Sequence, residues 1–354
     1  MQKPKGTKDI FENRMYFRQY VEEILVSNAI RFGFYRIETP IFEKKEVFIR
    51  TIGEKSDIVN KEVYSFIDKG NREMILRPEG TAGTLRAFAE NKLVQENGGN
   101  YKAFYYGPMF RYERPQRGRQ RQFTQFGIEY ISEKTLSNDL EVILLAANIL
   151  DELNIKYDLV INNLADKKTR NEYSKVLKEY LKKYKNQLTK ISIERLEKNP
   201  LRILDDKIDG LKEFVINAPR INDFYSEEQS AYLKDVEDSL KENNINVIIN
   251  HSLVRGLDYY TDIAFEFVST SEGVGSQSTI IGGGRYQNLL SVFGGPQKSG
   301  IGFAVGVERL VNEVEEDIVI KKPIDIFIAN ITKKSEKLIL KLIFDLRKSG
   351  LIVE

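Results

Sequence analysis

Residues Phe110 to Tyr130 read FRYERPQRGRQRQFTQFGIEY, and this segment indicates the architecture more clearly than any other part of the chain. Beyond Arg121 its polar and apolar residues alternate, which is typical of a strand with one buried face. The segment before it is rich in arginine and carries Pro115 and Gly118, which favour a loop. We therefore predict two strands within residues 104–131, joined by an arginine-rich loop.

The polar side chains of this segment are expected on one sheet face and the apolar ones on the other. The expected polar face carries Arg121, Gln125, Gly127 and Glu129, and the apolar face Phe126, Ile128 and Tyr130. The arginines are Arg111, Arg114, Arg117, Arg119 and Arg121. Guanidinium groups this close repel one another unless anions bind them, and their fork matches phosphate oxygens. A phosphate or nucleic-acid site is one interpretation, and an exposed charged hairpin is the other.

A second strand pattern begins after Arg255. Polar side chains fall at even positions (Asp258, Tyr260, Asp262 and Glu266), and apolar ones at odd positions (Leu257, Ile263, Phe265 and Phe267). If the faces bearing Glu129 and Tyr260 meet, they suit a small, polar, partly aromatic ligand. A sheet face exposed to solvent explains the same alternation.

Three shorter segments each allow two interpretations. Glu79 and Thr81 follow an apolar strand at the start of a predicted helix, so they either bind a ligand or cap free backbone N–H groups. The glycines at 282–284 before Arg285 form either a phosphate-binding turn or a tight hairpin. Residues 300–306 are a glycine-rich strand on which a flat ligand fits, and Arg309 in the next helix either stacks on an aromatic ring or is an ordinary surface residue.

Helical periodicity divides the rest of the chain. We predict helices at 8–32, 81–93 and 136–153, and a mainly helical insertion at 166–245 between strand-rich regions. Residues 323–354 read as a strand at 324–329, a helix at 335–348 and a strand at 351–353. So few strands cannot cover a core, so this last domain is expected to be incomplete.

Composition excludes several kinds of chemistry. The 354 residues contain no cysteine and one histidine, His251, which excludes disulfides, thiol nucleophiles and multi-histidine metal sites. We interpret His251 as a partly buried residue just before a strand. The net charge of +2 is too small for a polycation that coats nucleic acid. The longest apolar run, 142–150, is too short to span a membrane, so a cytoplasmic protein is expected.

Seven segments, taken together and in order, resemble the histidyl-tRNA synthetase family of the class II aminoacyl-tRNA synthetases. They are PKGTKD at 4–9, GFYRIETPIFE at 33–43, LRPEGTAG at 76–83, FRYERPQRGRQRQF at 110–123, LVRGLDYYT at 253–261, GGGRY at 282–286 and GFAVGVERL at 302–310. The resemblance implies an α+β fold with a six- to seven-stranded antiparallel sheet flanked by helices. It implies a discontinuous catalytic domain (1–165 and 246–322), the helical insertion at 166–245, and the incomplete start of an α/β anticodon-binding domain at 323–354, as in a truncated chain.

The resemblance also implies an activity. Such a ligase activates L-histidine with ATP and Mg²⁺ to histidyl-adenylate and pyrophosphate, and then transfers histidine to the 3′ end of its tRNA. It works as a homodimer formed largely through residues 33–40. Histidine would be held by Glu79, Thr81, Gln125, Glu129, Tyr259 and Tyr260. ATP would be held by Arg111, Arg119, Phe123, Gly302 and Arg309, with Phe123 and Arg309 on either side of adenine. Arg111, Arg255 and Gln125 would act on the reacting groups; metal ligands are not implied.

Two departures and two rival functions accompany this resemblance. Thr124 stands where the family often has histidine, and Gln287 and Asn288 replace a frequent Asp-Gly; Thr124 is expected on the apolar face, with little effect. One rival is a non-catalytic paralogue, the regulatory subunit of an ATP phosphoribosyltransferase, although such paralogues tend to lose the RPEGT and RGLDYY residues kept here. The other is a plain RNA-binding module that uses the arginine loop and the lysines at 175–185, which are otherwise a solvated helix face.

Overall fold

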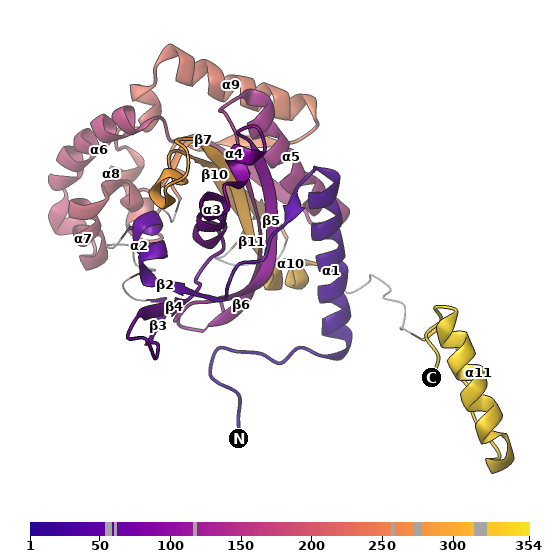
Figure 1. The fold of residues 1–354 in the computed structure, drawn as a ribbon. Helices are drawn as coiled ribbons and strands as arrows, with labels where there is room; N and C mark the ends of the chain where they lie inside the picture. The colour runs from indigo at the N-terminus through magenta and orange to yellow at the C-terminus, as the bar shows by residue number, and fades with distance from the viewer. Residues whose placement is uncertain (54–58, 60–61, 116–118, 256–258, 272–277, 315–323) are drawn as a thin grey trace. The chain divides into compact units, whose positions relative to one another are not determined.

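The computed structural model describes residues 1–53, 59, 62–115, 119–255, 259–271, 278–314 and 324–354 (Figure 1). The chain forms two compact units, the N-terminal unit Met1–Glu313 and the C-terminal unit Val314–Glu354. Each unit is described by itself. None of the helices in the described ranges is long and apolar enough to cross a membrane.

The N-terminal unit is built on an eight-stranded sheet. Its spatial order is β1 (Tyr35–Arg36), β5 (Tyr101–Phe110), β6 (Gln122–Ile131), β11 (Gly300–Gly306), β10 (Thr279–Tyr286), β9 (Tyr260–Ser269), β7 (Tyr157–Asn163) and β8 (Val247–Ile249). The six central strands are antiparallel, and the short edge strands β1 and β8 pair in parallel. The expected antiparallel sheet is confirmed in its six central strands, but the two parallel edge strands bring the total to eight, not six to seven. The two strands on either side of the arginine-rich segment are confirmed as well.

A smaller sheet and the helices complete this unit. The second sheet has the order β2 (Phe42–Lys44), β4 (Glu73–Leu76), β3 (Tyr64–Ile67). The helices are α1 (Glu12–Arg31), α2 (Lys45–Ile52), α3 (Thr81–Glu90), α4 (Leu93–Glu96), α5 (Leu136–Glu152), α6 (Lys167–Lys182), α7 (Lys190–Lys198), α8 (Glu213–Ile216), α9 (Glu227–Glu242) and α10 (Val307–Glu313). With helices and a mainly antiparallel sheet, the fold is α+β, as expected.

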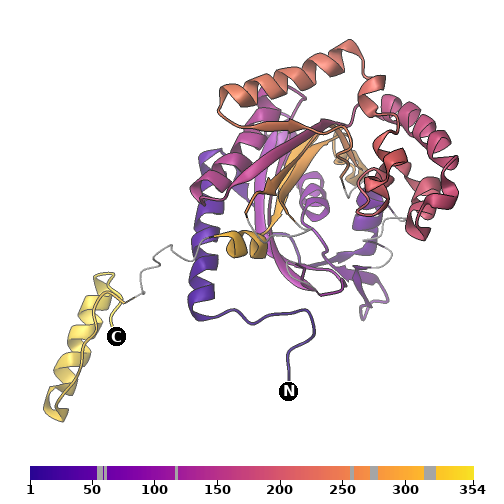
Figure 2. The ribbon, with the colours of Figure 1, turned by 180° about the vertical axis from the view of Figure 1, so that it is seen from behind.

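Helices cover both faces of the large sheet. In Figures 1 and 2, α1, α5 and α10 lie on one side and α3 on the other, and α1 contacts both α5 and α10. The face toward α1 and α5 is apolar: Phe126 and Ile128 are fully buried. The face toward α3 carries the polar side chains of β6, so the predicted division of the two faces is confirmed beyond residue 122.

Three local predictions are corrected by the structure. The first helix starts at Glu12 and not at residue 8, because Phe11 is extended. The glycines at 282–284 lie within β10 and form no turn, because both neighbouring strands continue past them. Asp262 leaves the face shared by Tyr260 and Glu266: it has a φ of 53° at an irregularity in the β9–β10 register, and its carboxylate accepts hydrogen bonds from Lys134 and Gln287. The predicted Leu257 and Asp258 lie outside the described residues.

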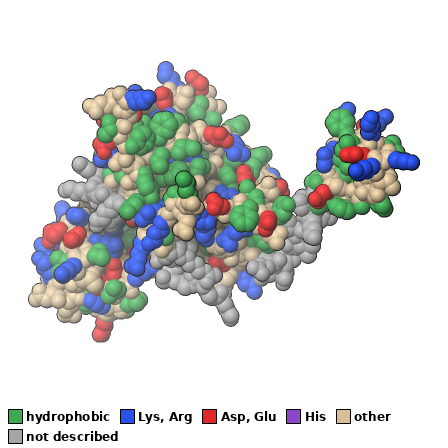
Figure 3. All heavy atoms as spheres, turned by 90° about the horizontal axis from the view of Figure 1, so that it is seen from below, with side chains coloured by type: hydrophobic (Ala, Val, Ile, Leu, Met, Phe, Trp, Pro, Cys, Tyr) green, Lys and Arg blue, Asp and Glu red, His purple; other side chains and the backbone are tan. Residues whose placement is uncertain are grey.

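The C-terminal unit contains one long helix, α11 (Glu336–Lys348), after the 3₁₀ turn η8 (Lys333–Ser335). The strand predicted at 324–329 is wrong: within the described residues there is an isolated parallel bridge between Ile326 and Val353, since two such short segments have no further strand to extend the ladder. Large apolar side chains of this unit are exposed, and several are visible in Figure 3. So few strands do not cover a core, as expected from the sequence.

Candidate active site

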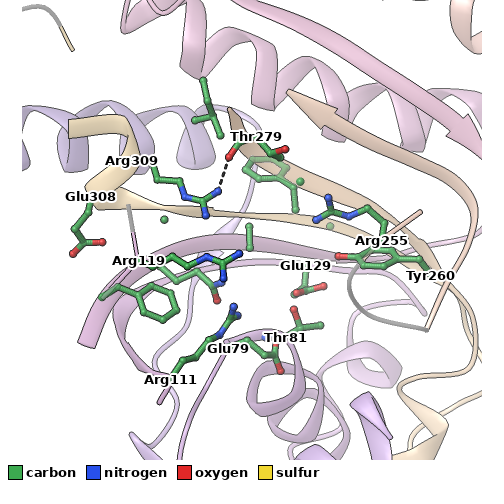
Figure 4. A pocket seen from close by; sticks show the side chains of 18 of the residues that line it. Glu79, Thr81, Arg111, Arg119, Glu129, Arg255, Tyr260, Thr279, Glu308 and Arg309 are labelled. Atoms are coloured by element: carbon green, nitrogen blue, oxygen red, sulfur yellow. Dashed lines mark hydrogen bonds between the residues drawn. The ribbon is translucent and has the colours of Figure 1, made fainter. Parts of the chain in front are cut away.

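One cavity of about 290 Å³ collects the site residues predicted from the sequence. It lies on the α3 side of the sheet and is lined by all twelve of them: Glu79, Thr81, Arg111, Arg119, Phe123, Gln125, Glu129, Arg255, Tyr259, Tyr260, Gly302 and Arg309. They come from the start of α3, the ends of β5, β6 and β9, the strand β11 and the helix α10. The side chains shown in Figure 4 face one another across the cavity.

One end of the cavity is acidic and well ordered by hydrogen bonds. Glu79 is 3% exposed and accepts the backbone N–H groups of Thr81 (2.6 Å) and Ala82 (2.9 Å) at the start of α3. The capping interpretation is therefore confirmed, and a capping carboxylate that also lines a cavity can still receive a ligand cation. Gln125 accepts the N–H of Gly80 (3.0 Å) through its side-chain oxygen, so its amide nitrogen is the group that a ligand can use.

Glu129 is the second carboxylate of this end, and it is 2% exposed. Its Oε2 accepts a 2.7 Å hydrogen bond from the hydroxyl of Tyr286, which is also buried. Burial raises the pKa of Glu129 to about 8, against the lowering effect of the Tyr286 hydrogen bond, and the nearby Glu79 raises it further. A buried carboxyl with one oxygen occupied by Tyr286 offers the other to a donor on a ligand.

The rest of the cavity is mainly cationic. Arg111, Arg119 and Arg309 line it, and Arg111, which donates to the carbonyl of Pro78 at 2.8 Å, lies nearest to Glu79 (Figure 4). Phe123 and Glu113 line it as well. Glu113 lies 3.3 Å from Arg119 and 3.9 Å from Arg111, so one carboxylate serves two guanidiniums. Burial lowers the pKa of Arg309, and the charges of Arg119 and Arg111 lower it further. Cations that destabilise one another in this way are suited to a polyanion such as a nucleotide phosphate chain.

Arg255 also lines the cavity, beside Tyr260 (Figure 4). Its guanidinium is paired with Glu266, and its carbon Cζ is 5.7 Å from the centre of the Tyr260 ring. Glu266 is itself fixed by the hydroxyl of Thr279 at 2.9 Å. The Nε–H of Arg255 is buried without a hydrogen-bond partner among the described residues, which leaves a donor for an anionic ligand.

Glycines on two strands make room for these charged groups. A Cβ on Gly282 would overlap the guanidinium of Arg255, and one on Gly302 would lie 2.7 Å from Oε2 of Glu129. The absent side chains therefore let Arg255 lie against β10 and Glu129 against β11. This close approach is the physical reason for the glycine-rich stretches in both strands.

Replacement of Gly302 by alanine is expected to destabilise the fold and the acidic end of the cavity. The added methyl group would overlap the carbonyl of Ile128 as well as Glu129, and overpacking of this kind costs about 1–3 kcal/mol. The midpoint of urea unfolding measures this loss of stability. Gly306→Ala in the same strand is the matched control, because its nearest neighbour is an Arg309 side-chain atom at 3.9 Å. Equal midpoints for the two variants would contradict the steric argument.

Some residues that the sequence singled out lie outside the cavity. Arg121 does not line the cavity, because its guanidinium stacks on Tyr112, 4.0 Å from the ring centre. Arg114 is outside the lining too, and Arg117 is not among the described residues. His251 is partly buried, as expected, but it follows β8; it lies 3.3 Å from Asn162 and away from the cavity.

Several lining residues were not predicted from the sequence: Glu113, Gln120, Thr279, Tyr286 and Glu308. Tyr286 belongs to the GGGRY segment, so that motif could have identified it as a site residue. Glu308 accepts the backbone N–H of Thr124 with both oxygens (3.0 Å each) and pairs with Arg18 at 3.1 Å. Thr124 is accordingly directed away from the main cavity, on the face where it was expected.

The chain is similar to known proteins over most of its length. The family model "Histidyl-tRNA synthetase" matches residues 6–310. A histidine–tRNA ligase of Ureaplasma urealyticum serovar 10 is 48% identical over 310 residues, covering 87% of this chain and 74% of the relative. One from Mycoplasma mobile is 44% identical over 359 residues, covering 100% and 80%. The crystal structure of apo S. aureus histidyl-tRNA synthetase superposes with a TM-score of 0.82 at 34% identity, covering 100% of this chain and 84% of that one. The chain therefore belongs to the histidyl-tRNA synthetase family.

Proposed function

We propose that this chain is a histidine–tRNA ligase that uses the cavity to join histidine to AMP and then transfers it to tRNA. The observation that carries the proposal is the set of charges that line one cavity: the buried carboxylates Glu79 and Glu129, and the guanidiniums of Arg111, Arg119, Arg255 and Arg309. An amino acid and a nucleoside triphosphate that react together need carboxylates for the cationic and N–H groups of the amino acid, and guanidiniums for the reacting carboxylate and the phosphates.

The acidic end would hold histidine. Glu79 and Thr81 would bind its α-amino group, while Glu129 and Tyr260 would bind the two imidazole nitrogens with Tyr259 beside them. Gln125 would use its amide nitrogen on the carboxylate. Because Glu129 is buried, a side chain that brings no donor would leave it without a ligand partner, which discriminates strongly against apolar amino acids.

The cationic part of the cavity would hold ATP. Phe123 and Arg309 would lie on either side of adenine, Gly302 would allow its close approach to β11, and Arg111 and Arg119 would contact the phosphates. A carboxylate oxygen of histidine would form a bond to the α-phosphorus while the bond to pyrophosphate breaks. Arg111 and Arg255 would balance the charge that develops, and no protein nucleophile is needed.

Mg²⁺ is proposed to enter with the phosphates of ATP. The described residues contain no group of three potential metal-ligating side chains, which fits a metal held mainly by substrate oxygens. Of the carboxylates that line the cavity, Glu113, beside Arg111 and Arg119, is the one we assign as a ligand of Mg²⁺. The metal would neutralise charge on the phosphates, and the arginines would orient them.

The organisation of the whole protein is proposed from the same family. Residues 1–165 and 246–322 would form the catalytic domain, 166–245 the insertion and 323–354 the start of the anticodon-binding domain. Residues of α6, α7 and α8 share a hydrophobic cluster of their own, whereas α9 contacts α5, β7 and β8, so the separate core of the insertion ends near residue 225. A cytoplasmic location is proposed as well. A homodimer formed through residues 33–40 is supported by Tyr35, which is 66% exposed at the sheet edge.

Histidine-dependent exchange of pyrophosphate into ATP tests the proposal. We expect exchange with histidine and with none of the other amino acids, in the presence of Mg²⁺ and without tRNA. Folded protein that binds histidine but catalyses no exchange would instead favour the non-catalytic regulatory paralogue. Steeply salt-dependent RNA binding without ATP binding would favour an RNA-binding module.

A further inference from the structure

The short segment between β7 and α6 lies directly against the start of β9. The side chain of Leu164 forms a buried cluster with Tyr260 and Ala264, and Tyr259 packs against this cluster. Leu164 and Tyr260 are 4% and 7% exposed. The segment that leads into the proposed helical insertion therefore supports the tyrosine that is proposed to contact the imidazole of histidine.

Two backbone hydrogen bonds join the same two segments. The N–H of Leu164 donates to the carbonyl of Asp262 at 2.6 Å, and the N–H of Asp262 donates to the carbonyl of Ala165 at 3.1 Å. Ala165 and Asp262 have φ angles of 57° and 53°, a region that is strained for residues other than glycine. Such strain persists only where the surrounding structure fixes it, so each segment holds the other in one conformation.

A charged side chain of α6 adds a third connection. The guanidinium of Arg170 donates a hydrogen bond to the backbone carbonyl of Tyr260, the first residue of β9. Hydrogen bonds from an ionised donor are roughly twice as strong as neutral ones. Tyr260 lines the active-site cavity and Arg170 does not, so Arg170 fixes the backbone from which the Tyr260 side chain reaches the cavity.

The turn of α6 that carries Arg170 is itself fixed in place. Asp166 caps the helix by accepting the N–H of Thr169 at 2.9 Å, and its other oxygen accepts a hydrogen bond from the side chain of Gln229 in α9 at 3.0 Å. The carbonyl of Asp166 accepts the backbone N–H of Arg170 at 3.0 Å. The guanidinium therefore projects from a helix start that is anchored to a second helix.

We propose that Arg170 is a positioning residue for histidine selection, which acts through Tyr260. The inference rests on the proposed function, in which Tyr260 contacts the imidazole. The helical region would thereby influence the choice of amino acid, although the described lining of the active-site cavity contains no residue from 166–245. A ligand that fixes Tyr260 should in turn stabilise the start of α6, because a coupling free energy between two sites acts equally in both directions.

Amino-acid activation without tRNA tests this proposal. Arg170→Ala is expected to raise the KM for histidine in pyrophosphate exchange about tenfold, as loss of one charge-assisted hydrogen bond does, and to leave the KM for ATP unchanged. Arg170→Lys keeps a charged donor near the carbonyl, so it should restore most of the histidine affinity. Lys175→Ala is the matched control, because Lys175 is exposed in the same helix and lies outside the cavity.

Hydrogen exchange of the same proteins tests the reciprocal effect. Histidine should slow the exchange of amide groups at 170–174 in the unaltered protein and have no such effect in Arg170→Ala. An unchanged KM for histidine in Arg170→Ala would overturn the proposal. Equal increases in the KM for histidine and for ATP would overturn it too, because general loss of structure predicts that result.

Failure of the proposed ligase activity is a separate outcome. The unaltered protein would then catalyse no exchange, whereas calorimetry would still give the Kd of histidine for the unaltered protein and for Arg170→Ala. A higher Kd in the variant would support the positioning role without the reaction, and equal Kd values would overturn it.

Discussion

Arg255→Ala is expected to lower the rate of histidine-dependent pyrophosphate exchange by about 10³-fold, a loss typical of removing one preorganised donor to a transition state. The guanidinium lines the cavity, is paired with Glu266 and has a buried Nε–H without a hydrogen-bond partner among the described residues. Its contact with the reacting groups should strengthen as charge shifts to pyrophosphate. The effect should therefore fall on kcat more than on the KM values, as measured by exchange at varied histidine and ATP.

Two further variants separate catalysis from folding. Arg255→Lys keeps the charge that pairs with Glu266 but loses the planar fork, so it should fold normally and still lose most activity. Arg72→Ala is the matched surface control, because that side chain is 65% exposed and pairs with Asp68 away from the cavity. Exchange by Arg255→Ala within threefold of the Arg72→Ala control would show that Arg255 does not act on the reaction.

Glu129→Gln is expected to raise the KM for histidine roughly 10²-fold and to leave the KM for ATP unchanged. Tyr286 donates to one oxygen of Glu129, and the imidazole N–H is proposed to donate to the other. Glutamine has an oxygen in place of one carboxylate oxygen and an NH₂ group in place of the other, so one of these two donors would face a group that cannot accept a hydrogen bond. Steady-state exchange at saturating ATP gives the KM for histidine, and calorimetry gives its Kd.

The matched control for this change is Glu90→Gln. Glu90 lies in α3, is 66% exposed and pairs with Arg86 outside the cavity. It should keep the histidine KM of the unaltered protein. If Glu129→Gln kept that KM as well, Glu129 would not contact the imidazole.

The same Glu129→Gln substitution should change the stability of the empty protein in a pH-dependent way. Burial raises the pKa of Glu129 from 4.5 to about 8, so the folded protein binds an extra proton between these values. The contribution of Glu129 to the free energy of unfolding is fully present below pH 4.5 and is lost as the pH rises through 8. Glutamine has no charge to bury, so the variant should gain thermal stability relative to the unaltered protein from pH 5 to pH 9. A constant difference across this range would contradict the raised pKa.

Much of the fold and of the candidate site could be predicted from sequence, because both depend on patterns that are local in the chain. Alternation beyond residue 122 predicted the strand β6 and which side chains share its polar face. The segment from Arg77 to Thr81 predicted the strand-to-helix junction and the capping role of Glu79. The strand expected at 324–329 failed because an isolated strand pair has too few partners, and local pattern carries no information about partners.

The sequence did not predict contacts between residues that are far apart along the chain. Tyr286 and Glu129 are 157 positions apart in sequence, and they meet because β11 lies between β6 and β10. Glu308 reaches Thr124 across 184 positions for a similar reason. Asp262 was misplaced because a bulge inverts the alternation at that point, and a bulge depends on the register of two strands.

The sequence by itself determined the strands, the helices and the residue types available for chemistry, since a chain with no cysteine and one histidine must rely on carboxylates, arginines and tyrosines. Tertiary structure decided which of these groups meet. It brought Glu79, Glu129 and Arg255 to one cavity, left Arg121 outside it, and joined Arg170 to the backbone of Tyr260. The physical reason is that secondary structure follows local backbone and side-chain preferences, whereas burial, pKa shifts and charge pairing depend on groups that only strand order and helix packing bring together.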